Sequence, residues 1–322
     1  MRLIRGLTNL KRLSRQAGSP LADGCVATIG NFDGVHLGHK TILDQVKEKA
    51  SALGVPSVVM IFEPQPREFF QGQEAPPRLM PFRQKFKALL DEGIDMVLCI
   101  RFDDTFRSYS AMGFVEDVLI TGLAVHHLVV GDDFRFGCDR AGDFRLLEQV
   151  GQAHDFTVEN TRTVTVDGER VSSTRVRNAL NVNGLEEAER LLGHPYRIHG
   201  RVVYGRQLGR QLGAPTANIL LDQMPALRGV YVVRARLETG AWVDGVANIG
   251  LRPTVDGKRP SLEVHLFDFA GTLYGQHLDV VFRHGLRDEV KFDSVDELRQ
   301  QIARDFKHAR AWLADHSAVP TN

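Results

Sequence analysis

The sequence predicts an α/β protein of two domains, a parallel sheet with helices followed by an antiparallel β-barrel that carries a terminal helix. In the N-terminal half, apolar runs typical of buried strands alternate with helical segments, as at 25–29 and 57–62. From Tyr196 onward, short alternating runs separated by turn residues are typical of antiparallel strands. With 322 residues the chain is long enough for two domains, which we place at 1–183 and 184–322.

Strands and helices alternate in the predicted N-terminal domain, after a short entry strand and a surface helix. The runs that read as strands lie at 25–29, 57–62, 96–100 and 127–130. Helices are expected at 42–53, 82–90, 110–122 and before 183, with an exposed loop over 71–81. Because strand, glycine turn, helix and strand make a βαβ unit, these strands should pair in parallel. Asp167-Gly168 predicts a hairpin.

A glycine-rich turn joins the first of these strands to the next helix and reads Gly30-Asn31-Phe32-Asp33-Gly34-Val35-His36-Leu37-Gly38-His39. Its glycines let backbone approach a ligand closely, and free N–H groups at the start of a helix attract phosphate. His36 and His39 stand three residues apart and so share one face. We interpret the turn as a triphosphate site; a cap or a packed polar side chain is the alternative for either histidine. A P-loop is excluded, because His39 occupies the position where that motif needs glycine before lysine.

Three segments follow predicted strands and should therefore meet at the carboxyl edge of a parallel sheet. They are the glycine-rich turn, Phe62-Glu63-Pro64-Gln65-Pro66 and Gly131-Asp132-Asp133-Phe134-Arg135-Phe136-Gly137. Their convergence predicts a ligand site more strongly than any one of them alone. For Phe134 and Phe136, core packing is an equally good interpretation.

The string GNFDGVHLGHK carries an H-x-G-H signature and resembles the bacterial bifunctional riboflavin kinase/FMN adenylyltransferase (FAD synthetase) family, from about residue 10 to 312. The resemblance implies a Rossmann-like nucleotidyltransferase domain with His36, His39 and Arg177 as catalytic residues. The contacts it implies with ATP are Gly30, Asn31, Phe32, Asp33, Gly38, Ser172, Ser173 and Thr174. The residues it assigns to flavin binding are Phe62, Asp133 and Phe136.

The segment Ser172-Ser173-Thr174-Arg175-Val176-Arg177 opens the last helix of this domain. Its hydroxyl side chains suit a helix N-cap, and they also suit contacts to phosphate beside an arginine fork. The segment resembles the family's S-S-T-x-x-R string, which is thought to close over the triphosphate. We favour Arg177 for that role and expect Arg175 to face solvent. Gln65 departs from the family pattern, since relatives commonly carry histidine there.

The C-terminal domain is predicted to begin with a short helix at 185–192. A series of strands follows, in which apolar and polar residues alternate. These strands lie at 201–204, 230–233, 241–243, 262–266 and 278–282. A last helix opens with the capping box Ser294-Val295-Asp296-Glu297. Its apolar stripe should pack on the barrel and comprises Val295, Leu298, Ile302, Phe306, Ala309 and Leu313.

A basic glycine loop begins at Gly205 and leads into Pro215-Thr216-Ala217-Asn218. Glycines in a basic loop suit phosphate binding. The tetrapeptide resembles the P-T-A-N signature of riboflavin kinases, which implies that Thr216 and Asn218 hold Mg²⁺. The implied contacts with the ATP of the kinase are Gly205, Gly209, Arg210, Gly213, Pro215 and Asn218. Ala214 replaces the phenylalanine usual before this proline, so we expect a slightly altered pocket wall.

Glu263 lies in a predicted strand and matches the base proposed for the family. A carboxylate there could take the proton from a substrate hydroxyl; an outward-facing strand residue is the alternative. The resemblance thus implies two ATP-dependent steps. The C-terminal domain would phosphorylate riboflavin to FMN, and the N-terminal domain would adenylylate FMN to FAD with release of pyrophosphate. Mg²⁺ is expected in both.

Composition narrows the possible partners. Lys+Arg 40 and Asp+Glu 40 cancel, so no whole-chain field draws the protein to nucleic acid or to an anionic membrane. The apolar runs are far shorter than the ~20 residues of a membrane span. Cys25, Cys99 and Cys138 are widely spaced and odd in number, which favours a reducing compartment over a disulfide framework or a zinc site. We expect a cytoplasmic enzyme with small-molecule substrates, for which an oligomer is possible but not required.

Two alternative functions stay open from the residues. A different nucleotidyltransferase would activate another phosphorylated small molecule with CTP or ATP, but it would have no reason to carry the P-T-A-N barrel. A flavin carrier or a nucleic-acid-binding barrel would release no pyrophosphate from ATP and FMN. Neutral overall charge and the lack of an aromatic-basic surface argue against nucleic acid.

Overall fold

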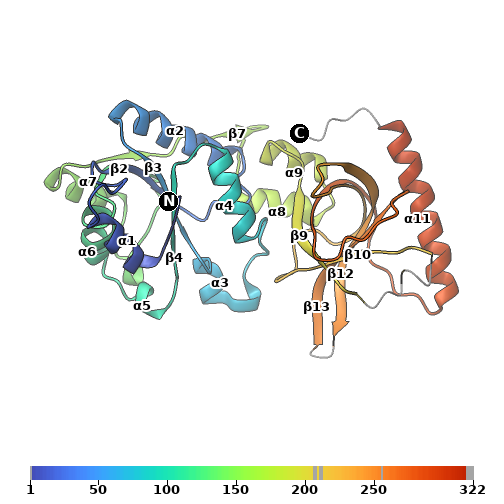
Figure 1. The fold of residues 1–322 in the computed structure, drawn as a ribbon. Coiled ribbons are helices and arrows are strands. Elements are labelled where there is room, and N and C mark those ends of the chain that lie inside the picture. The colour runs from blue at the N-terminus through green and yellow to red at the C-terminus, as the bar shows by residue number, and fades with distance from the viewer. Residues whose placement is uncertain (1, 206–208, 210–212, 255–256, 317–322) are drawn as a thin grey trace. The chain divides into compact units, whose positions relative to one another are not determined.

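The computed structural model describes residues 2–205, 209, 213–254 and 257–316. The chain divides into two compact units (Figure 1), one of Met1–Pro76 with Met80–Val171 and the other of Pro77–Leu79 with Ser172–Asn322. The first unit holds the predicted parallel sheet and the second the predicted barrel. The helix after Ser172 therefore groups with the barrel, while the domain boundary after residue 183 stays a prediction.

The sheet of the first unit has six parallel strands in the order β1-β4-β3-β2-β5-β6. They are β1 (Leu3–Arg5), β2 (Cys25–Ile29), β3 (Ser57–Phe62), β4 (Met96–Ile100), β5 (Val125–Val130) and β6 (Thr157–Asn160). The predicted parallel pairing is confirmed. The sequence gives no sign of β6, because this edge strand is partly exposed and has no apolar run.

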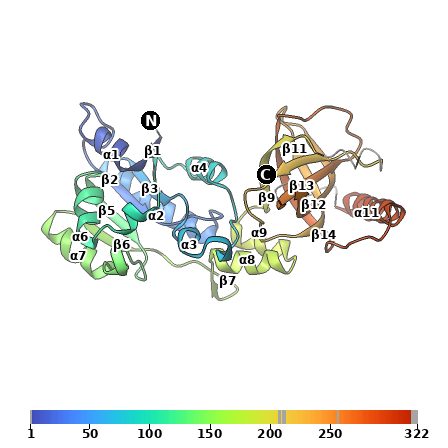
Figure 2. The ribbon, with the colours of Figure 1, turned by 90° about the horizontal axis from the view of Figure 1, so that it is seen from below.

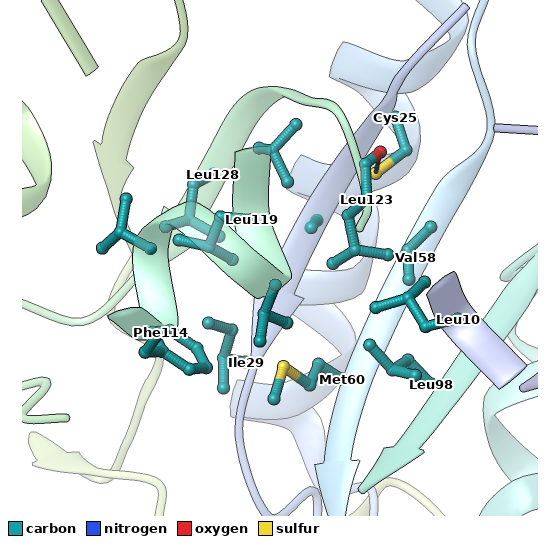
Figure 3. Packing of buried hydrophobic residues seen from close by; sticks show 14 of the residues in the cluster. Leu10, Cys25, Ile29, Val58, Met60, Leu98, Phe114, Leu119, Leu123 and Leu128 are labelled. Carbon is teal, nitrogen blue, oxygen red and sulfur yellow. Dashed lines mark hydrogen bonds between the residues drawn. The ribbon is translucent and has the colours of Figure 1, made fainter. Parts of the chain in front are cut away.

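Helices cover both faces of this sheet (Figures 1 and 2). One face carries α1 (Gly6–Ser14), α5 (Asp104–Arg107), α6 (Ala111–Phe114), its π-helical continuation η2 (Val115–Ile120) and α7 (Phe144–Ala153); the other carries α2 (Leu37–Leu53) and α4 (Phe82–Asp91). Successive strand residues alternate between the two cores. Val58 and Met60 lie in the first core, which Figure 3 shows, and Val59 and Ile61 lie in the second. Strands buried on both faces read as continuous apolar runs, which is why the sequence reveals them.

Short elements connect these layers, namely α3 (Pro66–Gln71), η1 (Gly72–Glu74), η3 (Cys138–Arg140), β7 (Thr165–Val166) and β8 (Glu169–Arg170). The predicted hairpin is confirmed: Asp167 and Gly168 have φ of 55° and 79°, as a two-residue turn of type I′ requires. The expectation of an exposed loop over 71–81 is wrong near its end. Met80 is 4% exposed there and packs in the core beneath α2 and α4.

The second unit begins with α8 (Ser173–Asn181) and α9 (Leu185–Leu192), which precede a closed antiparallel barrel. The six strands are β9 (Arg197–Val203), β10 (Ala217–Leu220), β11 (Gly229–Arg236), β12 (Trp242–Thr254), β13 (Gly257–Leu266) and β14 (His277–Arg287). Around the barrel their order is β10-β13-β12-β11-β14-β9. The predicted barrel is confirmed. Strand β10 was not among the predicted strands, because its residues overlap the Pro215–Asn218 motif.

Helix α11 (Val295–Asp315) lies alongside the barrel (Figures 1 and 2). Ser294 caps it, since its Oγ accepts a 3.2 Å hydrogen bond from the backbone N–H three residues on. The side chains that pack on the barrel are Phe306, Ala309, Trp312 and Leu313. Val295 is predicted from the sequence to belong to the apolar stripe, but it is 62% exposed. The contact between the helix and the barrel therefore begins later in α11.

Candidate active sites

The glycine-rich turn between β2 and α2 has an unusual backbone. Phe32, Gly34 and Val35 have φ of 46°, 89° and 40°, in the left-handed region. For phenylalanine, and above all for a β-branched valine, this conformation costs about 1–3 kcal/mol. Packing maintains it, because Phe32 is 1% and Val35 2% exposed in the core beneath α2. Strain that packing holds in place is typical of functional turns.

His36 and His39 lie together at the start of α2. His36 is the N-cap, and its Nδ1 accepts the backbone N–H of His39 at 3.2 Å. The two rings are stacked, with centroids 3.6 Å apart and planes at 13°. Gly38 permits this arrangement, because a Cβ there would lie 3.2 Å from Cε1 of His36 and 3.3 Å from the carbonyl oxygen of Val171. The predicted pairing of the two histidines on one face is confirmed.

The order of the strands brings the three expected segments together. β3, β2 and β5 are neighbours, so Phe62–Pro66, the glycine-rich turn and Gly131–Gly137 leave adjacent strands at the same edge. In the last segment, the backbone N–H of Asp132 donates to Oδ1 of Asn160 at 3.1 Å. The predicted convergence is therefore confirmed, and β6 helps to hold the third segment.

An aromatic row runs along this edge of the sheet and consists of Phe62, Phe106, Phe114 and Phe136. Its ring centroids are 5.5 Å apart between Phe62 and Phe106, 6.2 Å between Phe106 and Phe114, and 5.3 Å between Phe114 and Phe136. The row thus links Phe62 and Phe136, which the family resemblance assigns to flavin binding. Phe136 is 8% exposed and belongs to the core, as the alternative interpretation held.

Two further phenylalanines extend the row toward solvent. Phe102 lies 5.7 Å from Phe62 and 5.7 Å from Phe70, between ring centroids, and Phe70 is 62% exposed. Sequence reasoning missed both, because they come from separate short helices and loops without periodicity. Their contact depends on strands β3 and β4 being neighbours.

Two polar side chains in these segments take part in the fold itself. Asp33 is 1% exposed, and its Oδ1 accepts the backbone N–H of Met80 at 3.3 Å. Gln65 is the N-cap of α3 in a capping box, and its backbone N–H donates to Glu68 at 2.9 Å. Gln65 therefore has a structural role at the start of α3. A nucleotide contact by Asp33 stays a prediction.

The segment after the hairpin begins α8. Ser172 is its N-cap and accepts the backbone N–H of Arg175 at 3.2 Å. The expectation that Arg175 faces solvent is wrong: its side chain is 19% exposed and donates to Glu187 at 2.6 Å. Nε of Arg177 donates to the carbonyl oxygen of Pro77 at 2.7 Å. The roles of Ser172, Ser173, Thr174 and Arg177 toward a triphosphate stay predictions.

In the barrel, three polar residues stand side by side on neighbouring strands. Glu263 of β13 pairs with Asn218 of β10 on one side and with Asn248 of β12 on the other. Residues paired in this way point to the same face with Cβ atoms about 4.5–5.5 Å apart. Leu262 and Val264 are fully buried inside, so Glu263 faces outward, as its alternative interpretation held. It is nevertheless half-buried between the two asparagines.

The P-T-A-N motif is fixed by its neighbours. Nδ2 of Asn218 donates to the carbonyl oxygen of Thr216 at 3.2 Å and lies 3.4 Å from its Oγ1. A Cβ on Gly205 would lie 2.6 Å from Nδ2 of Asn218, so glycine permits this approach. Nδ1 of His265 lies 2.9 Å from the carbonyl oxygen of Pro215. Burial lowers the pKa of His265, which favours a neutral ring that donates from Nδ1.

The glycine loop before this motif is only partly described, and Arg210 falls outside the described residues. The backbone N–H of Ala214 donates to the carbonyl oxygen of Gly209 at 2.7 Å, and Gly213 has φ of 74°. Sequence reasoning missed an aromatic pair beside the loop. Tyr204, directly before Gly205, stacks on Tyr274 with centroids 3.9 Å apart and is 72% exposed.

The donor chemistry of the barrel site suits magnesium. Among the described residues, no group of three or more His, Cys, Asp and Glu side chains could hold a metal ion. Mg²⁺ instead binds through one or two protein oxygens together with phosphate and water ligands. The hydroxyl of Thr216 and the amide of Asn218, two residues apart in the motif and 3.4 Å from each other, fit that requirement.

Comparison with known proteins assigns the two units to families. A family model described as FAD synthetase matches residues 19–175, and one described as Riboflavin kinase matches residues 192–313. A bifunctional riboflavin kinase/FMN adenylyltransferase of Pseudomonas fluorescens is 54% identical over 316 residues, 98% of each chain. The chain belongs to the bifunctional riboflavin kinase/FMN adenylyltransferase family.

Another bifunctional riboflavin kinase/FMN adenylyltransferase, from Escherichia coli (strain K12), is 49% identical over 97% of this chain and 98% of its own. A solved structure titled "Crystal Structure of Macrolide-efflux Protein from Streptococcus pneumoniae" matches with a TM-score of 0.73 and 30% identity, covering 90% of this chain and 94% of that one. None of the helices in the described ranges has the length and apolarity to cross a membrane. The family resemblance and the predicted order of its two parts are confirmed.

Proposed function

We propose that the protein makes FAD in two ATP-dependent steps on one chain. The barrel unit phosphorylates riboflavin to FMN, and the sheet unit transfers AMP from ATP to FMN and releases pyrophosphate. The observation that carries the proposal is the stacked pair of His36 and His39 at the start of α2. The names of relatives that are 54% and 49% identical over nearly the whole chain support both steps.

The adenylyl step needs charges in fixed positions and no base, because the phosphate of FMN is already anionic. A phosphate oxygen of FMN bonds to the α-phosphorus of ATP, and the bond from that phosphorus to the bridging oxygen breaks as pyrophosphate leaves. Nδ1 of His36 accepts a backbone N–H, so its neutral ring carries the proton on Nε2 and can donate it to a phosphate oxygen. The N-terminus of α2 adds positive potential at the same place.

Backbone N–H groups of the glycine-rich turn bind the triphosphate of this step. The family resemblance assigns the hydroxyls of Ser172 to Thr174 and the guanidinium of Arg177 to the same substrate. The aromatic row offers ring faces and edges to the flavin, with Phe62 as the member that ends strand β3. Asp133 lies in the segment after β5, and the family resemblance assigns it to FMN or its phosphate-side contacts.

The kinase step needs a base, because a hydroxyl is a poor nucleophile until it loses its proton. The carboxylate of Glu263 takes the proton of the riboflavin 5′-hydroxyl, whose oxygen bonds to the γ-phosphorus of ATP while ADP leaves. Asn218 and Asn248, paired with Glu263 across the strands, flank it on either side. Thr216 and Asn218 would hold Mg²⁺, which would supply positive charge to neutralise the phosphate oxygens.

We further propose a cytoplasmic protein that acts on small molecules, has no nucleic-acid partner and requires no oligomer for catalysis. Cys25, Cys99 and Cys138 are free thiols, as a reducing compartment allows. The balanced charge of the chain supports the absence of a nucleic-acid partner.

Pyrophosphate release tests the proposal. The purified chain with ATP, Mg²⁺ and FMN should release pyrophosphate and FAD in equal amounts, and with riboflavin it should release ADP and FMN. Chelation of the metal should stop both reactions. If ATP and FMN give neither pyrophosphate nor FAD, the adenylyl half is refuted; if riboflavin gives no ADP, the kinase half is refuted.

A further inference from the structure

The sheet unit contains a cavity apart from the residues assigned to catalysis. It has a volume of about 400 Å³ and is lined by Arg5, Gly6, Glu63, Phe82, Cys99 and Arg101. These residues end or follow β1, β3 and β4 or begin α1 and α4. None belongs to the glycine-rich turn or to the aromatic row, although Glu63 directly follows Phe62 in the segment after β3. In open parallel sheets, ligands gather at this carboxyl edge of the strands.

Positive charge dominates the lining. Arg5 pairs with Cys99 in the β1–β4 register, and its guanidinium lies 5.6 Å from the centre of the Phe82 ring. Lys85 is fully buried in the first turn of α4, and its positive charge opposes the rise that burial causes in the pKa of the Cys99 thiol. Arg101 is 82% exposed and lies 3.6 Å from Asp103, a weak surface pair.

Among the six lining residues, the two arginines outnumber the one carboxylate, Glu63, so the lining carries a net positive charge. The helix starts add to it. Gly6 and Phe82 are the first residues of α1 and α4, and neither helix has a side-chain cap or an acidic residue in its first turn. The positive ends of both helix dipoles thus lie at the cavity.

We propose that this cavity binds a phosphate monoester that carries a planar aromatic group. Its phosphate pairs with Arg5 and Arg101, because a guanidinium fork matches phosphate geometry. Its ring packs against Phe82 and the Cys99 wall, which are apolar. The volume lies within the range of about 300–1,000 Å³ typical of small-molecule sites. Two sources supply this chemistry, an adenine nucleotide or a flavin phosphate, and the lining contains none of the residues assigned to catalysis.

Cys99 offers a reporter for occupancy. It is 8% exposed in the cavity wall, whereas Cys25 is fully buried and Cys138 is exposed. In the full-length Cys138→Ser protein, alkylation by iodoacetamide can therefore be followed at Cys99 by mass spectrometry. Burial raises the pKa of Cys99 to about 11, so the reaction at about pH 9 is slow enough to time. The probes are AMP, FMN and inorganic phosphate.

Either AMP or FMN should slow alkylation of Cys99 at least fivefold, and the one that does so identifies the source. Arg5→Ala with Arg101→Ala should raise the ligand concentration needed at least tenfold. Arg12→Ala with Arg15→Ala, which removes two exposed arginines from α1 and its end, is the matched control and should leave protection unchanged. The protein with alanine at both histidines of the glycine-rich turn should keep protection.

Several results would overturn the proposal. The first is that neither AMP nor FMN protects Cys99, and the second is that protection is equal in the variant that lacks Arg5 and Arg101. The third is that protection is lost when the two histidines are replaced by alanine. The fourth is that inorganic phosphate protects Cys99 as strongly as AMP or FMN. If Cys99 does not react even without ligand, equilibrium dialysis decides. The unmodified protein should then bind one more equivalent of AMP or FMN than the double-arginine variant, and equal stoichiometry refutes the site.

Discussion

Replacing Gly38 with alanine should slow adenylyl transfer to FMN and leave riboflavin phosphorylation unchanged. The added Cβ would lie 3.2 Å from Cε1 and 3.3 Å from Nδ1 of His36, and 3.3 Å from the carbonyl oxygen of Val171. Such contacts are tighter than ordinary van der Waals contact, so the ring has to move by a few tenths of an ångström. The ring of His39, with its centroid 3.6 Å away, limits movement on the other side.

The expected loss follows from the size of that movement. A misplacement of ~1 Å in an active site costs ~100-fold in rate, so a few tenths of an ångström predicts a fall in kcat of roughly fourfold to tenfold. The variant should stay folded, because Gly38 lies in the first turn of α2 without a positive φ, a conformation that alanine readily adopts. A loss of activity would therefore report geometry and not unfolding.

The assay follows FAD from FMN and FMN from riboflavin by chromatography in one preparation, so that the kinase serves as internal reference. Gly54→Ala is the matched control: it makes the same substitution at the other end of α2, where φ is 69° and no atom lies within 4 Å of the added Cβ. It should destabilise the protein by about 1–2 kcal/mol and leave the kcat of FAD formation unchanged. A normal kcat in Gly38→Ala, or an equal loss in Gly54→Ala, would refute the reasoning.

Three further predictions concern the second unit. Glu263→Gln should lower FMN formation by at least ~100-fold while supplied FMN still becomes FAD; normal phosphorylation of riboflavin would exclude Glu263 as the base. The fragment 172–322 should unfold at a higher temperature than the fragment 184–322, because α8 packs on α9 and Arg175 forms an ion pair there with Glu187, which is 28% exposed. Equal midpoints of thermal unfolding would contradict the grouping of α8 with the barrel. Burial lowers the pKa of His265 from 6.5, so the stability it contributes is present above about pH 6.5 and is lost as pH falls. Between about pH 7.5 and pH 5.5 the wild-type midpoint should drop further than that of His265→Gln, and parallel curves would show that this histidine contributes nothing.

The elements that sequence reasoning locates best are those whose pattern depends only on their own residues. β2, β3 and β4 are buried on both faces and read as apolar runs. β6 has one partner and a polar sequence, and it becomes a strand only because β5 lies beside it. The prediction that Arg175 faces solvent is wrong because its environment also depends on another element. Its acidic partner, Glu187, comes from the next helix.

The candidate sites divide in the same way. The pairing of His36 and His39 follows from their spacing in one helical turn, so the sequence predicts it. The aromatic row and the alignment of Glu263 with Asn218 and Asn248 depend on which strands are neighbours and in which register. The pairing register of two strands cannot be derived from a single sequence. These contacts are therefore known only from the fold.

The histidine pair is the centre of the account, and one measurement tests it most directly. The double variant His36→Ala with His39→Ala is supplied with riboflavin, ATP and Mg²⁺, and both flavin products are followed over time. We predict that FMN accumulates at the wild-type rate while FAD no longer forms. Formation of FAD at the wild-type rate by this variant would contradict the assignment.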